Sequence, residues 1–85
     1  MAELSSLKNI GKEIERKLKT IGINSAEELK EIGSKDTWFR LKLKYPEICL
    51  VHLYTLEGAI SDTEYNQLSE ETKKDLKAFT DQWKG

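Results

Sequence analysis

Cys49 and His52 are the two side chains in this sequence that together could perform nucleophilic chemistry. They are three positions apart in a segment with helical periodicity, and this spacing suggests a thiolate and imidazole pair. No Asp or Glu lies three or four residues from His52 to orient the imidazole. Free cysteines in apolar helices are commonly buried. We therefore expect Cys49 to be a core residue that alkylates slowly, and we expect no catalytic residues.

Motifs typical of enzymes are absent from the sequence. There is no Walker loop, no dinucleotide-binding glycine motif, no nucleophile elbow, no paired cysteine motif and no His-Glu-x-x-His. One cysteine and one histidine form neither an internal disulfide nor a conventional four-ligand zinc site. We expect a non-catalytic protein without cofactor or metal.

A different chemistry, anion binding, is predicted at residues 7–18, which read LKNIGKEIERKL. This segment resembles a helix-hairpin-helix motif, in which a tight hairpin precedes a helix whose first backbone N–H groups face a DNA phosphate. Exposed amides and the positive end of the helix dipole favour an anion regardless of base sequence. The candidate phosphate-binding residues are Lys8, Asn9, Gly11, Lys12 and Arg16.

Asn9 stands where that motif has its first glycine, and Asn tolerates the left-handed backbone region better than most residues. An alternative interpretation stays open, in which Ile10 fills the core and the neighbouring lysines are solvated. Glu13 and Glu15 lie among the basic residues and reduce the local positive potential.

Length and composition predict one small domain that spans residues 1–85, and its formal charge is −1. Residues 1–45 carry ten Lys and Arg against seven Asp and Glu, whereas residues 46–85 carry four against eight. We therefore expect an acidic partner to bind residues 1–45. No signal peptide or membrane-spanning stretch is evident, so we expect a cytoplasmic location and no membrane partner.

Apolar residues recur at helical spacing, and no run alternates with a period of two, which predicts an all-α fold of about five helices. The expected elements are a short helix from Leu4 to Ile10, a helix from Lys12 that ends at Gly22, a helix capped by Asn24 or Ser25 that ends at Gly33, a helix capped by Ser34 that ends at Tyr45, a central buried helix from Pro46 to Ile60, a turn begun by Asp62 or Thr63, and a last helix capped by Ser69. Leu76, Phe79 and Trp83 of the last helix should close the core. Gly58 interrupts the apolar central helix, and close packing should require it.

The pentapeptide Leu-Lys-x-Ile-Gly occurs at Leu7–Gly11, Leu18–Gly22 and Leu29–Gly33, each copy eleven residues after the last. The unit is too short for a solenoid repeat. We interpret it as three turns formed by the same apolar and glycine chemistry, and we expect replacement of Gly22 by Val to be costly.

A second resemblance covers most of the chain. The residues that carry it are Asn9–Lys12, Leu18–Ile23, Ala26–Leu29, Ile32–Lys35, Tyr45–Glu47, His52–Tyr54 and Leu56–Ile60. This succession is similar to the TfoX (Sxy) C-terminal domain. The resemblance implies a helical, helix-hairpin-helix-like domain of bacterial regulators of DNA transformation, or competence, in which it commonly follows a separate N-terminal domain. We expect this chain to be a stand-alone copy.

Two functions are compatible with these features. The first is a non-catalytic DNA-associated or regulatory module that contacts phosphates without base specificity, with duplex DNA as partner. The alternative is a protein-interaction module without DNA binding, whose partner is a separate TfoX N-terminal-type domain or a second copy of the chain in a homodimer.

Overall fold

The predicted all-α class is confirmed, with five α-helices in the described part of the chain. The computed structural model describes residues 3–82, and this part of the chain contains no strand. The elements in chain order are η1 (Leu4–Ser6), α1 (Lys12–Thr20), α2 (Ala26–Ile32), α3 (Ser34–Lys44), α4 (Leu50–Ser61), η2 (Tyr65–Gln67) and α5 (Glu70–Asp81), where η denotes a 3₁₀ helix.

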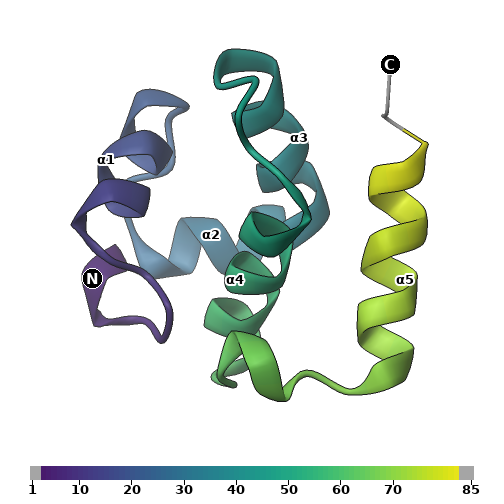
Figure 1. Cartoon of the computed structure of the whole chain (residues 1–85). Coiled ribbons are helices and arrows are strands. Elements are labelled where there is room, and N and C mark those ends of the chain that lie inside the picture. The colour runs from purple at the N-terminus through teal and green to yellow at the C-terminus, as the bar shows by residue number, and fades with distance from the viewer. Residues whose placement is uncertain (1–2, 83–85) are drawn as a thin grey trace.

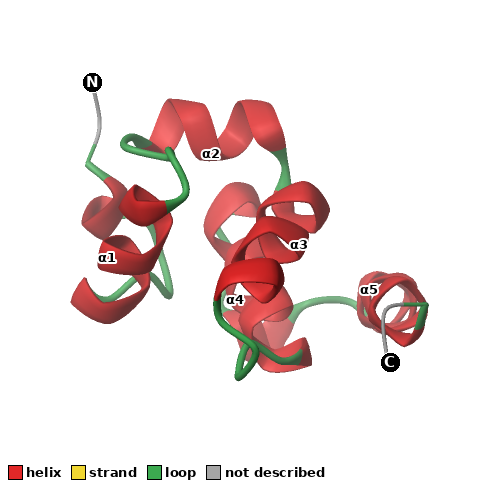
Figure 2. Ribbon diagram, turned by 90° about the horizontal axis from the view of Figure 1, so that it is seen from above, coloured by secondary structure: helices red, strands yellow, loops and turns green. Residues whose placement is uncertain are grey.

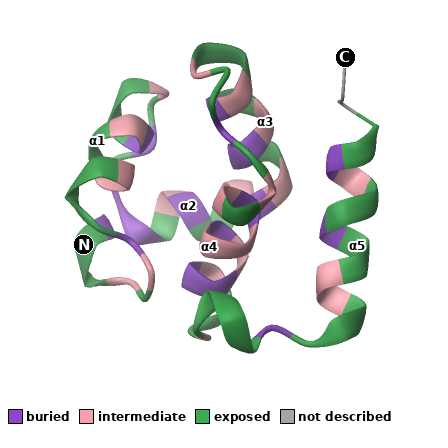
Figure 3. Ribbon diagram, viewed as in Figure 1, coloured by how far each residue is buried: buried purple, intermediate pink, exposed green. Residues whose placement is uncertain are grey.

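Helix α4 is the centre of the core, as its apolar sequence predicts. It contacts α2, α3, α5 and η2, and its residues Leu53, Leu56 and Ala59 are at most 1% exposed. Helices α3 and α4 lie in the middle of the molecule, with α1 on one side and α5 on the other (Figures 1 and 2). Buried positions of α5 lie on its side toward this centre, and the outer sides of α1 and α5 are mostly exposed (Figure 3).

Side-chain caps start α2 at Ser25, one of the two candidates in the sequence, and α5 at the predicted Ser69. The hydroxyl oxygen of Ser25 accepts from the backbone N–H of Glu28 at 3.2 Å, and that of Ser69 accepts from the N–H of Thr72 at 3.2 Å. Both caps satisfy a donor that has no partner within its helix.

The three pentapeptide copies form two different structures. Gly22 and Gly33 have φ of 89° and 93° and end α1 and α2. After α1, the N–H groups of Gly22 and Ile23 donate to the carbonyls of Lys19 and Leu18, which is the Schellman pattern. In the first copy Gly11 has φ −93°, and Asn9 adopts the left-handed conformation instead, with φ 69°. The expectation that all three copies form the same turn is therefore wrong. The first copy precedes a helix, whereas the other two end one.

We expect Gly22→Val to lower the free energy of unfolding by about 1–3 kcal/mol, because a β-branched residue is strained at positive φ. An added β-carbon has nothing within 4 Å, so backbone strain is the dominant cost. Gly11→Val is the control: its backbone is extended, and it should lose less than about 1 kcal/mol, from the weaker N-cap. Urea unfolding checks the pair, and equal losses would contradict the assignment.

The beginning of α4 differs from the prediction. The helix starts at Leu50 and not at Pro46, because side chains of α3 bind the carbonyls of the preceding segment. Lys42 Nζ donates to the carbonyls of Pro46 at 2.7 Å and Ile48 at 2.9 Å. Trp38 Nε1 donates to the carbonyl of Cys49 at 3.0 Å. These bonds hold residues 46–49 in an irregular turn, so proline forms no first helical turn here.

Three smaller expectations also need correction, and a fourth is not tested. Only one 3₁₀ turn, Leu4–Ser6, forms in the segment where a short helix was predicted. Ser34 is the first residue of α3 and Gly33 is its N-cap. Asp62 ends α4 in the left-handed conformation, with φ 57°, and begins no new turn. Trp83, expected in the core, lies outside the described residues.

Candidate functional site

The N-terminal end of α1 carries the backbone donors that could bind an anion. Gly11 is the N-cap and has no side chain to satisfy them. Within residues 3–82, no hydrogen bond is made by the N–H groups of Gly11, Lys12, Glu13 and Ile14. Gly11, Lys12 and Glu13 are exposed, and Ile14 is half-buried. The first turn of α1 therefore presents free donors at the positive end of the helix dipole.

Asn9 connects this hairpin to the end of α4. Its Nδ2 donates to the carbonyl of Thr63 at 3.0 Å, and its Oδ1 accepts from the N–H of Tyr65 at 3.3 Å. Gly58 lies beneath this bridge: a β-carbon there would overlap with Asn9 Nδ2 and the Thr63 carbonyl oxygen. The side chain of Asn9 thus holds the hairpin in place, and both of its polar atoms already have partners.

The charged candidates differ in how they are engaged. Lys8 lies 3.9 Å from a carboxylate oxygen of Glu64, and both side chains are about half exposed. Lys12 is exposed and forms no ion pair within residues 3–82. Arg16 Nη2 donates to Glu13 at 2.8 Å. Lys12 and Arg16 are four residues apart and share a face of α1.

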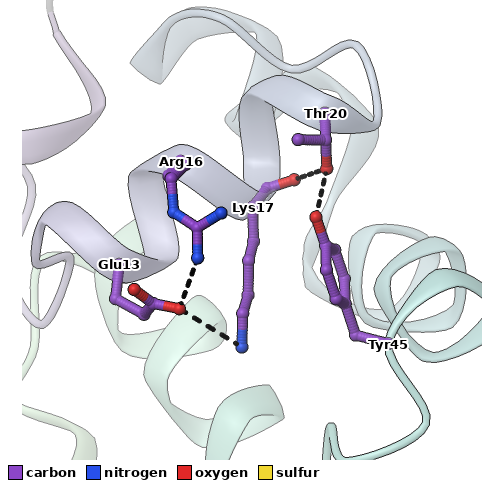
Figure 4. A network of polar contacts seen from close by, with 5 residues as sticks. All are labelled: Glu13, Arg16, Lys17, Thr20 and Tyr45. Atoms are coloured by element: carbon purple, nitrogen blue, oxygen red, sulfur yellow. Dashed lines mark hydrogen bonds and ion pairs between the residues drawn. The ribbon is translucent and has the colours of Figure 1, made fainter.

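Glu13 binds two cations of the same helix (Figure 4). Besides Arg16, Lys17 lies 3.8 Å from its carboxylate. Lys17 also lies 5.2 Å from the centre of the Tyr45 ring, and the Tyr45 hydroxyl is 2.9 Å from that of Thr20. Lys17 therefore helps to join α1 to the end of α3. Among the cations of α1, Lys12 is the one closest in sequence to the free amides.

Lys19 is a further residue of this surface that our sequence interpretation missed. It is exposed and lies seven residues after Lys12, which places it on the same helix face as Lys12 and Arg16. The signal was available in the sequence, because 12, 16 and 19 follow helical spacing.

Cys49 is exposed, so the expectation that it is a core residue is wrong. It is the N-cap of α4, and its N–H donates to Nδ1 of His52 at 3.1 Å. The Sγ atom lies 3.4 Å from the same nitrogen. A protonated imidazole could not accept from this N–H, so the cap requires neutral His52. The pair thus has a structural task at the start of the central helix.

The pKa of His52 lies below its ordinary value of 6.5 because the ring is partly buried, and the charge of nearby Lys17 lowers the pKa further. Glu47 opposes this shift. In the unfolded chain His52 binds a proton at higher pH than in the folded protein. The stability that neutral His52 contributes is therefore complete above about pH 6.5 and is lost as the pH falls through the folded pKa.

We expect the free energy of unfolding to be lower at about pH 5 than at about pH 7.5, and this difference to shrink in His52→Gln. Urea unfolding at both pH values measures it. An NMR titration of the His52 ring checks the cause directly, and a ring pKa at or above 6.5 would contradict this account.

Two further classes of site receive no support from the geometry. Among residues 3–82, no three His, Cys, Asp or Glu side chains are grouped so that they could hold a metal ion. Every helix in this range is too short or too polar to cross a bilayer.

Fold and site together define a small all-α domain whose first hairpin presents the amino end of a nine-residue helix. The chain belongs to the TfoX C-terminal domain family, whose model matches residues 1–80. No curated protein matches the sequence.

Solved structures share this fold, among them two from Listeria monocytogenes. An uncharacterized protein from Listeria monocytogenes, in a triclinic crystal form, is 41% identical with a TM-score of 0.89, over 92% of this chain and 89% of that one. A protein of unknown function from the same organism, in a tetragonal form, is 38% identical with a TM-score of 0.93, over 96% of this chain and all of that one.

Proposed function

We propose that this domain is a non-catalytic, DNA-associated module that contacts backbone phosphates at the N-terminal end of α1. The observation that supports this proposal is that, within residues 3–82, the N–H groups of residues 11–14 make no hydrogen bond and the adjacent Lys12 side chain forms no ion pair. Regulation of DNA transformation, which the family resemblance implies, and a cytoplasmic location belong to the same proposal.

The roles of the candidate residues are distinct. Gly11 and Lys12 offer backbone donors, and the side chains of Lys12, Arg16 and Lys8 add positive charge. Asn9 acts through its backbone conformation, since its side chain is occupied by Thr63 and Tyr65. Exposed ion pairs such as that of Arg16 with Glu13 are weak, so a phosphate can compete for the guanidinium.

Binding should be weak and steeply dependent on salt. Three cations that each neutralise one phosphate give a slope of about −3 in log K against log salt. Glu13 and Glu15 in the first turn of α1 reduce the affinity further. Backbone donors and lysine or arginine charges that contact phosphates carry no sequence information, so the affinity should vary little with DNA sequence.

The test is a titration of a short mixed-sequence DNA duplex against the labelled protein, with backbone amide shifts recorded at about 20 mM and 300 mM salt. We expect shifts at residues 8–19 that vanish at high salt. Lys12→Glu should weaken binding severalfold. The matched control Lys77→Glu, on the exposed face of α5, makes the same change of net charge and should have little effect.

Two outcomes would overturn the proposal. One is an absence of shifts at low salt. The other is an equal effect of Lys12→Glu and Lys77→Glu, which would show a response to net charge alone.

A second candidate function, a protein-interaction module, is favoured by a separate observation. Leu43 is 71% exposed and Val51 is 53% exposed, and a partner that covered these side chains would remove apolar surface from water. This candidate would be supported, in the form of a homodimer, if a protein sample that does not bind DNA had twice the monomer mass in solution.

A further inference from the structure

A groove of about 620 Å³ lies between α5 and the junction of α2 with α3, with part of its wall from α4. Aliphatic side chains from three helices line it: Ile32 and Ile60 are half-buried, and Leu76 is 2% exposed. The groove is remote in sequence from the hairpin, and the DNA proposal uses none of its residues. Its size suits two or three side chains of a partner.

The rim of the groove is acidic. Four carboxylates line it, from Asp36, Glu57, Glu71 and Asp75, against the single cation Lys35. Lys35 Nζ pairs with Asp75 at 2.7 Å, and Glu57 accepts from the Ser34 hydroxyl at 2.6 Å. The formal charge of this lining is −3.

Two of the carboxylates are available for a partner. Asp36 and Glu71 are exposed, and neither forms an ion pair within the described residues. They stand on opposite sides of the groove, one on α3 and one on α5. A ligand with positive charge at both edges and an apolar middle would complement this arrangement.

The contact between Lys35 and α5 stabilises the groove wall. Besides its pair with Asp75, the Lys35 ammonium lies 5.7 Å from the centre of the Phe79 ring, and this ring packs edge-on against Trp38 with centroids 5.9 Å apart. Contacts along one side of α5 therefore join it to α3, so the groove is a formed feature of the fold.

We propose that this groove binds a basic amphipathic segment of a partner protein, with aliphatic side chains between Ile32, Ile60 and Leu76 and Lys or Arg side chains at Asp36 and Glu71. A helix with aliphatic residues three or four positions apart and basic residues on either side presents these groups on one face. This inference deepens the protein-interaction candidate and is independent of the DNA proposal.

The probe is a capped twelve-residue peptide of Leu and Lys in amphipathic helical order, titrated against the labelled full chain. We expect saturable amide shifts at residues 32–36, 57–60 and 71–76. The same composition in scrambled order, and a Leu and Glu peptide in the original order, should bind at least about tenfold more weakly. Spermidine, which supplies positive charge without aliphatic side chains, should also bind more weakly.

The double variant Asp36→Asn, Glu71→Gln should weaken the Leu and Lys peptide about five- to tenfold, because two exposed ion pairs are lost. The matched control Glu47→Gln, Asp62→Asn removes two exposed carboxylates outside the groove and should change the affinity less than about twofold. Unchanged amide spectra of the free variants would show that both remain folded.

Three results would overturn the inference: no saturable shifts up to about 1 mM peptide, shifts centred elsewhere, or equal effects of the two double variants. Equal binding of spermidine and peptide would also overturn it, by showing that charge alone decides. Because shifts caused by duplex DNA are expected at residues 8–19, failure of the groove and failure of the DNA proposal can be told apart.

Discussion

Gly58→Ala should lower the free energy of unfolding by about 3 kcal/mol, although Ala is the better helix former by about 1 kcal/mol. The new β-carbon would overlap with Nδ2 of Asn9 and with the carbonyl oxygen of Thr63. Overpacking costs about 1–3 kcal/mol, and the hydrogen bonds of Asn9 to Thr63 and Tyr65 add about 1 kcal/mol each if they break. For a chain of 85 residues, with roughly 4–13 kcal/mol in total, this is a large loss.

Asn9→Gly provides the control, because glycine keeps the left-handed backbone while it removes the side-chain bonds. Alone it should cost about 1–2 kcal/mol. In the Asn9→Gly background, Gly58→Ala should cost about 1 kcal/mol less than in the natural sequence, since one of the two overlaps is gone. Urea unfolding of the four proteins measures this cycle, and a Gly58→Ala protein more stable than the parent would refute the role given to the bridge.

Trp38→Ala should destabilise the protein by about 3–5 kcal/mol, the usual cost of removing a large buried aromatic side chain. Trp38 is 2% exposed, stacks edge-on against Phe79, and donates to the carbonyl of Cys49. Its removal leaves a cavity between α3 and α5 and frees the segment that precedes α4. Circular dichroism during thermal unfolding provides the measurement.

Trp38→Phe separates these contributions, because it keeps an aromatic ring and removes only the indole N–H and part of the volume. We expect a loss of about 1–2 kcal/mol, from the lost indole hydrogen bond and the reduced volume, because the Cys49 carbonyl still accepts from the N–H of His52. Amide exchange at residues 50–53 should increase in this variant more than exchange in α1. If Trp38→Phe were as damaging as Trp38→Ala, the hydrogen bond and not packing would dominate.

Helix ends could be predicted where their chemistry is local. Ser25, Ser69 and Gly22 act within four residues of themselves, so their roles follow from residue type and spacing. The start of α4 could not be predicted in this way. It depends on Lys42 and Trp38, whose side chains reach carbonyls four to eleven positions later only once α3 is packed.

The candidate site shows the same division. The tolerance of Asn9 for positive φ and the place of the free amides follow from the hairpin sequence. The partners of the Asn9 side chain lie 54 and 56 residues away, and no local pattern identifies them. The exposure of Cys49 was missed for a related reason, since it follows from where α4 begins. Gly58 was the only sequence feature that pointed to this long-range contact. A glycine in an apolar helix indicated that another segment packs closely there, but it did not identify that segment.

The bridge from Asn9 to Thr63 and Tyr65 also bears on the order in which the molecule is assembled. Closing a loop of more than fifty residues is entropically costly until other contacts shorten it. Asn9 is synthesised before Thr63 and Tyr65, so its bridge can form only after Tyr65 has been synthesised. The residues of the hairpin are thus synthesised well before the residues that hold Asn9 in place.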